Sequence, residues 1–318
     1  MPQLYRREQL HPHVRAIMDE TGTGDPFEAV RIKARNAVAH YHQFLAESPP
    51  FNMRAVASTF GLHWSEDDPR YSADSEISPE SDGRVVLRVN KSRPETRQRF
   101  SIGHEIGHTL FPEYELSVQC RKATDRTWAD PNDLIETLCD TAASELLFPT
   151  PWFSDRILAM PFCAAAIATL ADDYKASREA TARRFVEIHE EPLAAVFFSW
   201  KLKPTEIRSV KARSKTSSLF PGMELPGPVP MLRVDYRIIN EEFAARCTDY
   251  IPDDKSIPSE GPIYLASESQ SPQNGLQVLD FGRAPRKFEI NALPIFTHEH
   301  ELGPNGGSSV VAILRPSR

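Results

Sequence analysis

Two histidines stand four residues apart in the segment RFSIGHEIGHTLFPEY, with a glutamate directly after the first. On an α-helix, residues four apart lie about 40° from each other around the axis, so His104 and His108 project side by side. Two imidazoles placed in this way can share one zinc ion. Glu105 is rotated by about 100° and is suited to act as general base on an attacking water. The pattern indicates metal-assisted hydrolysis, although the same five residues also occur by chance on helices.

A catalytic zinc ion needs a third protein ligand. The extended pattern H-E-x-x-H-x-x-G-x-x-H would require glycine and histidine where this chain has Phe111 and Tyr114. A glutamate from a second helix is the other common solution. The helix expected from about Asn132 to Phe148 offers Glu136 and, four residues on and on the same face, Asp140. This spacing permits a division of roles, with Glu136 binding the metal and Asp140 orienting a histidine through its N–H.

Other polar side chains compete for these roles. Glu145, nine residues after Glu136, is an alternative ligand. Glu113 and Glu115 lie just past the histidine helix and are expected to be solvated. A side chain that stabilises the oxyanion is also expected. The candidates, among which the sequence does not choose, are Tyr114, Arg121, Arg126 and His189.

Helix and strand signals precede the histidine helix. Asp25 and Asn52 are the expected N-caps of two helices, which end at Ser48-Pro49-Pro50 and at Gly61. The run RVVLRVN, residues 84–90, alternates in a way that predicts a strand with one buried face. Such a strand is also able to bind an extended substrate by strand addition.

The histidine helix itself is expected to start at a capping box made by Ser92 and Glu95, with Pro94 tolerated in its first turn. Gly103 and Gly107 weaken this helix by roughly 1 kcal/mol each relative to alanine. Glycines at these positions indicate that something approaches the backbone closely, or that metal binding and packing support the helix.

Composition is that of a globular protein of 318 residues, with 40% hydrophobic and 25% charged residues. The net charge of −7 argues against a non-specific nucleic-acid coat. The chain shows neither an apolar run of about 18 residues nor an N-terminal secretion signal. Its four cysteines are scattered without a C-x-x-C pair. These features predict a cytoplasmic protein with buried thiols and no membrane partner.

Two short helices joined by a tight turn follow in LADDYKASREATARRF, a segment similar to a helix-turn-helix. Ser177 is the expected cap of the second helix. On or near the exposed side of that helix lie Arg178, Arg183 and Arg184, which are the candidates for contact with DNA. Lys175 stands where a turn glycine is commonest, and the aspartates of the first helix would face phosphates unfavourably. A structural helical hairpin packed on the N-terminal domain is the alternative.

Composition shifts after the helix pair. Lysines and arginines gather in residues 201–215, and a Pro/Gly-rich run follows, which is typical of a linker. Beyond it, strand-like runs, GPIYLAS among them, surround one helix-like run, NEEFAARC. They predict a small α+β domain with Phe281, Phe288 and Phe296 in its core.

The chain as a whole is therefore expected to be α+β. We divide it into a zinc metallopeptidase domain (1–160), a helix-turn-helix-like segment (161–200), a basic Pro/Gly-rich linker (201–230) and a C-terminal α+β domain (231–318).

The strand, the histidine helix and the glutamate helix, RVVLRVN…RFSIGHEIGHTLF…ETLCDTAASELLFP, together resemble the ImmA/IrrE family of metallo-endopeptidases. That family shows a strand, an R-F-x-x-A-H-E-x-G-H helix and an E-x-x-A-N-x-F-A-x-x-L-L-M-P helix. The match covers roughly residues 25–150. The chain departs from these patterns at Gly103, Cys139-Asp140, Ala142-Ala143 and Phe148, and none of the departures removes a reactive group.

The resemblance implies a minigluzincin-like domain, mainly helical with a small sheet. It implies zinc bound by His104, His108 and Glu136, with Glu105 catalytic. The implied substrate is a protein, a DNA-binding repressor whose cleavage induces stress-response or mobile-element genes. Some family members of this length carry a GAF-like sensor domain after a helix-turn-helix, which is our expectation for the C-terminal domain. A DNA-binding transcriptional regulator with a structural or vestigial zinc site is the alternative function.

Overall fold

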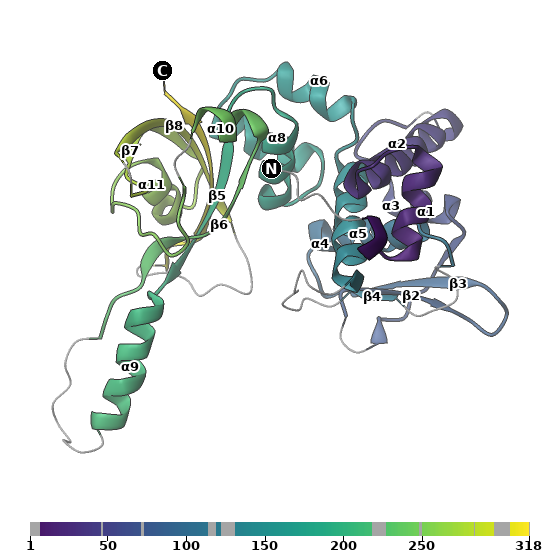
Figure 1. Ribbon diagram of the computed structural model, residues 1–318, viewed down its shortest axis with the longest axis horizontal. Coiled ribbons are helices and arrows are strands. Elements are labelled where there is room, and N and C mark those ends of the chain that lie inside the picture. The colour runs from purple at the N-terminus through teal and green to yellow at the C-terminus, as the bar shows by residue number, and fades with distance from the viewer. Residues whose placement is uncertain are drawn as a thin grey trace. The chain divides into compact units, whose positions relative to one another are not determined.

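The structure is a computed structural model that describes residues 7–45, 47–70, 73–113, 119–121, 131–217, 227–247, 250–282, 284–295 and 306–317 (Figure 1). The chain divides into two compact units, and each mixes helices with a sheet. The N-terminal unit comprises Met1–Leu158 and Asp172–Ser177, and the C-terminal unit comprises Ala159–Ala171 and Arg178–Arg318. The predicted α+β class is confirmed. The four-part division at 160, 200 and 230 stays a prediction.

The described helices of the N-terminal unit include the four that were expected, at 26–45, 53–59, 95–109 and 131–147. The helices are α1 (Pro12–Thr21), α2 (Pro26–Leu45), α3 (Met53–Thr59), α4 (Glu95–Thr109), α5 (Pro131–Leu147) and α6 (Trp152–Leu158), preceded by a 3-10 turn at Arg7–Gln9. Both expected N-caps are confirmed. The carboxylate of Asp25 accepts a hydrogen bond from the backbone N–H of Phe27, and Asn52 Oδ1 accepts from Arg54 and Ala55. These side chains satisfy N–H groups that a helix start leaves without an intrahelical acceptor.

The predicted capping box of α4 is wrong. The N-cap of α4 is Pro94, and no side chain caps the helix there. The Ser92 hydroxyl instead donates to Asn90 Oδ1 at 2.6 Å. A residue before proline is held in extended conformation, so Arg93 cannot enter the helix and Ser92 lies outside the cap position.

A four-stranded sheet completes the N-terminal unit. Its strands are β1 (Leu62–Trp64), β2 (Ser75–Pro79), β3 (Val85–Val89) and β4 (Gln119–Arg121), in the order β1-β3-β2-β4. β1 runs parallel to β3, whereas β2 runs antiparallel to both β3 and β4. The strand predicted at 84–90 is confirmed as β3, but its proposed pairing with a substrate is wrong. β3 lies between β1 and β2, so its backbone is already paired on both sides.

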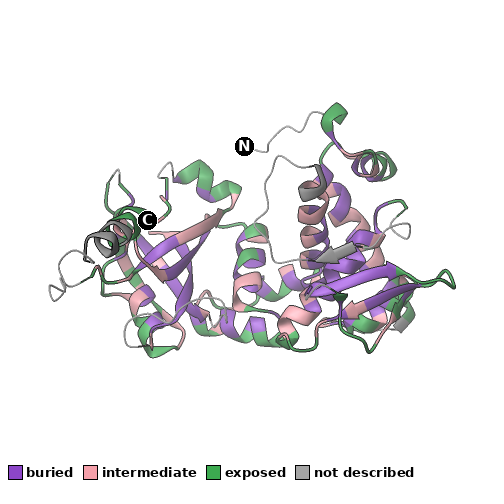
Figure 2. Ribbon diagram, turned by 90° about the horizontal axis from the view of Figure 1, so that it is seen from below, coloured by how far each residue is buried: buried purple, intermediate pink, exposed green. Residues whose placement is uncertain are grey.

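The C-terminal unit is built on a five-stranded antiparallel sheet. The strands β6 (Met231–Ile239), β5 (Ala194–Lys201), β9 (Ser309–Pro316), β8 (Arg286–Ile295) and β7 (Gln273–Leu279) are neighbours in that order. Buried residues fill its central strands (Figure 2). Two of the predicted core phenylalanines, Phe281 and Phe288, are buried, which confirms them, and Phe296 lies outside the described residues. The GAF-like character of this domain stays a prediction.

Two helices connect β6 to β7. The first, α10 (Glu241–Arg246), was expected, and Asn240 caps it. The second, α11 (Pro262–Ser269), occupies the run GPIYLAS, so the prediction of a strand there is wrong. Pro262 stands at the start of the helix, where its missing N–H is not needed, and Gly261 turns the chain at a φ of 88°.

The helix pair of the helix-turn-helix-like segment is present as α7 (Ala164–Asp173) and α8 (Arg178–Ile188). Lys175 in the turn has a φ of 50°, the left-handed conformation that usually selects glycine. α8 packs on the C-terminal sheet, against β5, β6, β8 and β9. Within the segment expected to be a linker, Pro204–Ser217 form the helix α9. Among the described residues, no helix has the length and apolarity needed to cross a bilayer.

Candidate metal centre

α4 and α5 cross with almost no side chain between them. A Cβ atom added to Gly107 would lie 2.8 Å from the Cα of Cys139, and one added to Gly103 would lie 3.1 Å from the Cα of Ala143. Cβ atoms essentially never approach other atoms to less than 3.0 Å, so the contact at position 107 requires glycine. The prediction that something approaches these glycines closely is confirmed, and it is the backbone of α5.

This close approach brings the carboxylate of Glu136 to both histidines. Oε2 of Glu136 lies 3.2 Å from Nε2 of His104, and Oε1 lies 3.4 Å from Nε2 of His108. Two ligands at about 2.0–2.1 Å from one zinc ion in tetrahedral arrangement are about 3.3–3.4 Å apart. The donor atoms and their separations therefore fit a zinc ion.

Exposure to solvent differs among the three side chains. Those of His104 and His108 are 0% and 3% exposed, whereas 27% of the Glu136 side chain is exposed. A catalytic zinc site keeps one position open for water or substrate. The centre can therefore be reached from the side of Glu136.

Asp140 lies where the sequence placed it, one helical turn after Glu136. Its Oδ1 is 2.8 Å from Nδ1 of His104. Because a carboxylate only accepts, the hydrogen lies on Nδ1, and Nε2 keeps its lone pair toward the carboxylate of Glu136. A carboxylate in this position fixes both the tautomer and the orientation of a metal-binding imidazole.

Glu105 is fully buried beside the histidines. Its Oε1 accepts a hydrogen bond of 2.6 Å from the hydroxyl of Ser75, at the start of β2. Sequence reasoning missed Ser75, because the two residues are 30 positions apart and the short strand SEISP carries no signal of its own.

Cys139 is a second residue that sequence reasoning missed as a candidate ligand. Its buried thiol lies near the histidines, with the potential ligand atoms of His104, His108 and Cys139 all within 4.8 Å of one another. The spacing offers a signal in retrospect, since position 139 lies three residues after Glu136 on α5. The separations of 3.2 and 3.4 Å between Glu136 and the histidine Nε2 atoms, which match those between two ligands of one zinc ion, favour Glu136 as the third ligand.

Part of the chain is similar to known proteins. Residues 64–186 match the family model Peptidase_M78, described as the IrrE N-terminal-like domain. This part of the chain is thus similar to the IrrE N-terminal-like domain. The chain is 26% identical over 188 residues to the radiation response metalloprotease IrrE of Deinococcus radiodurans, which covers 59% of this chain and 54% of that protein. This chain thus spans about half the length of the curated relative that it matches.

A solved structure is also similar, at low identity. It is a transcriptional regulator of Mycobacterium tuberculosis with 11% sequence identity and a TM-score of 0.49. The match covers 95% of this chain and 80% of that one. Similarity at this level assigns no function.

The other acidic candidates of the N-terminal unit have different partners. Glu145 is buried, and its Oε1 accepts a hydrogen bond of 3.1 Å from the backbone N–H of Thr150 after α5. The Glu113 side chain is 67% exposed, as expected, and lies 3.6 Å from His13. Glu115 lies outside the described residues. Glu145 is thus engaged in shaping the turn that follows α5.

Of the oxyanion candidates, Tyr114 and Arg126 lie outside the described residues, and Arg121 is described only through its backbone in β4. His189 belongs to the C-terminal unit, where its Nδ1 accepts from the backbone N–H of Glu191 at 3.0 Å. Burial lowers the pKa of His189 below its usual value. The assignment of an oxyanion-stabilising residue stays open among these four.

The three arginines proposed to contact DNA have partners within the C-terminal unit. Arg178 donates to the carbonyl of Pro294 at 2.9 Å, and the guanidinium of Arg183 lies 5.1 Å from the ring centre of Tyr236. Arg184 is buried and lies 3.6 Å from Glu187. Their contact with DNA stays a prediction, and Arg178 and Arg183 contact residues of β8 and β6 in the sheet.

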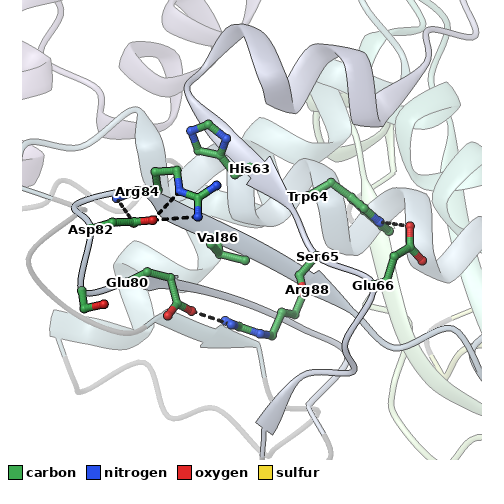
Figure 3. A pocket seen from close by; sticks show the side chains of 10 residues that line it. His63, Trp64, Ser65, Glu66, Glu80, Asp82, Arg84, Val86 and Arg88 are labelled. Carbon is green, nitrogen blue, oxygen red and sulfur yellow. Dashed lines mark hydrogen bonds and ion pairs between the residues drawn. The ribbon is translucent and has the colours of Figure 1, made fainter.

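A polar pocket lies over β1, the β2–β3 turn and β3 (Figure 3). Arg84 pairs with Asp82 at 2.7 Å, and Arg88 pairs with Glu80 at 2.5 Å. Trp64 lines the same pocket beside them. The lining residues do not include His104, His108, Glu105 or Glu136, and the charged groups of the pocket are paired, Glu66 with Lys91 outside the lining.

Proposed function

We propose that this chain is a zinc-dependent endopeptidase that cleaves a DNA-binding repressor in the cytoplasm and thereby induces stress-response or mobile-element genes. The observation that carries the proposal is the separation of 3.2 and 3.4 Å between Glu136 and the two histidines, which fits one shared zinc ion. A structural zinc site has no need of Glu105, which lies between the histidines in the sequence. The match of residues 64–186 to a peptidase family model supports the same function.

Each residue of the centre has a defined task in this reaction. When bound, zinc supplies the Lewis acidity that polarises the scissile carbonyl and lowers the pKa of a water. Glu105 takes a proton from the attacking water and later returns it to the leaving amine, because an amide nitrogen leaves only when protonated. Asp140 keeps His104 in the tautomer with the hydrogen on Nδ1, and so keeps Nε2 available.

The first test measures zinc and new protein N-termini. Purified wild-type chain is expected to contain one zinc ion and to generate a small number of new N-termini in a cell lysate. Candidate repressors that carry such a cut are then incubated with the chain alone. Glu105→Gln keeps the size of the side chain but cannot accept the proton. We expect it to retain zinc and to cleave at least about 100-fold more slowly.

Two results would contradict the proposal. Cleavage undiminished in Glu105→Gln would exclude this mechanism. Tight binding to DNA with one zinc ion and no proteolysis would favour the alternative, a DNA-binding regulator with a structural zinc site.

A further inference from the structure

The hydroxyl of Ser75 on β2 contacts both the proposed general base, Glu105, and the backbone of the same helix, α4. Ser75 is fully buried at the first position of β2. Its Oγ is 2.6 Å from Oε1 of Glu105 and 3.5 Å from the carbonyl oxygen of Ser101, one turn earlier on α4. A hydroxyl has one hydrogen to donate, and the shorter distance assigns it to Glu105.

The neighbour of Ser75 on one side fixes β2 to the start of α4. Asp74 is 3% exposed and accepts hydrogen bonds from Arg93 at 2.7 Å and from Arg97 at 2.6 Å. Arg97 stands in the first turn of α4 and Arg93 just before it. Because the pairs are charged and partly buried, they hold the strand and the helix in one register.

The neighbour on the other side fixes β2 within the sheet. Glu76 is fully buried, accepts from Arg70 at 2.6 Å and lies 3.6 Å from Arg88 on β3. Burial opposes ionisation of Glu76, but the hydrogen bonds and charge of Arg70 outweigh it and hold the pKa of Glu76 below its usual value. Ser75 therefore sits between two anchored residues, and its hydroxyl has little freedom to move away from Glu105.

We propose that Ser75 is a positioning residue that orients Glu105 for proton transfer. A carboxylate accepts at both oxygens, so a donor on Oε1 sets the plane of the group and the direction of Oε2. A misplacement of about 1 Å at a reacting group costs up to about 100-fold in rate. In this role Ser75 acts through Glu105. The proposal rests on the peptidase function proposed above.

The test compares Ser75→Ala with Ser75→Thr and Ser78→Ala in the full chain. Threonine keeps the hydroxyl and suits a strand. Ser78 is a matched control, since it is a buried serine on the opposite face of β2 that accepts from Arg88. The substrate is the best-cleaved member of an internally quenched peptide library. Zinc affinity is measured by chelator competition.

For Ser75→Ala we expect kcat to fall about 10- to 100-fold with KM and zinc affinity unchanged. Ser75→Thr is expected to restore most of kcat, and Ser78→Ala to keep it. Equal losses in Ser75→Ala and Ser78→Ala, or a loss that follows zinc affinity, would show a merely structural role. Unchanged kcat in Ser75→Ala overturns the role of Ser75 and leaves the peptidase intact. Wild-type chain that binds zinc and cleaves nothing overturns the peptidase and with it the catalytic task of Ser75.

A second measurement needs no substrate. The free energies of unfolding of Ser75→Ala, Glu105→Gln and the double variant are expected to be non-additive, because the residues share a hydrogen bond. Additive values would overturn the contact itself.

Discussion

Nδ1 of His104 on α4 donates a hydrogen bond to Oδ1 of Asp140 on α5 over 2.8 Å. The bond joins the two helices beside the proposed metal ligands, and it holds the imidazole with Nε2 toward the carboxylate of Glu136. Asp140→Ala is expected to lower zinc affinity about 10- to 100-fold. Asp140→Asn retains an acceptor oxygen and is expected to lose less. Competition with a chromophoric chelator measures both, and equal affinities in all three proteins would show that Asp140 does not support His104.

Removal of Glu136 and of Cys139 separates the two candidates for the third ligand. Glu136→Ala is expected to abolish stoichiometric zinc binding at micromolar metal, since two histidines alone hold zinc weakly. Cys139→Ala is expected to keep one zinc ion per chain, because the Glu136 oxygens lie 3.2 and 3.4 Å from the histidine Nε2 atoms, as two ligands of one zinc ion would. Zinc measured after gel filtration decides between them. The opposite pattern would make Cys139 the ligand.

Gly107→Ala tests the helix crossing. The added methyl group would lie 2.8 Å from the Cα of Cys139, so α4 and α5 have to separate. Overpacking of this kind costs about 1–3 kcal/mol of the free energy of unfolding. Urea unfolding measures that loss, and zinc affinity is expected to fall with it. Gly24→Ala is the control, because nothing lies within 4 Å of a Cβ at that position. Equal stability of the two variants would exclude a tight crossing.

Arg70→Ala tests the anchoring of β2 through its dependence on pH. The folded-state pKa of Glu76 is depressed by Arg70, so the pair stabilises the fold above the unfolded pKa of a glutamate. That stability is lost as the pH falls through the folded-state pKa. We expect Arg70→Ala to lower the free energy of unfolding by about 1–3 kcal/mol at pH 7, and to approach wild type in acid. The exposed pair Arg84–Asp82 provides the control, since Arg84→Ala is expected to change little. A loss that is independent of pH would assign Arg70 a packing role alone.

Much of the candidate metal centre could be predicted from the sequence, because helical periodicity indicates which residues share one face of a helix. His104 and His108 lie one turn apart, as do Glu136 and Asp140, and the structure brings these pairs together. Their roles as ligands and as orienting group stay predictions that the experiments above address. The glycines at 103 and 107 also pointed to a close neighbour, since their local cost needs a compensating contact.

The remaining features depend on contacts that no short pattern contains. Ser75 meets Glu105 only after β2 has found its place beside α4, and nothing in the alternation of β3 reveals that it lies between two other strands. The run GPIYLAS is too short for the spacing of its apolar residues to distinguish a helix from a strand. Pro262 favours a helix start, and the run forms a helix. α9 lies in a basic segment whose charges resemble those of a linker.

The absence of a side chain at Gly107 also gives a criterion for deciding which related chains can form such a metal centre. A relative that keeps both histidines and both glutamates but carries a larger residue at this position must hold its two helices farther apart. Its ligands would then be too widely spread to close on one ion, even though every reactive group is present. The absence of a side chain at a single position is thus as informative about a working centre as the presence of the histidines.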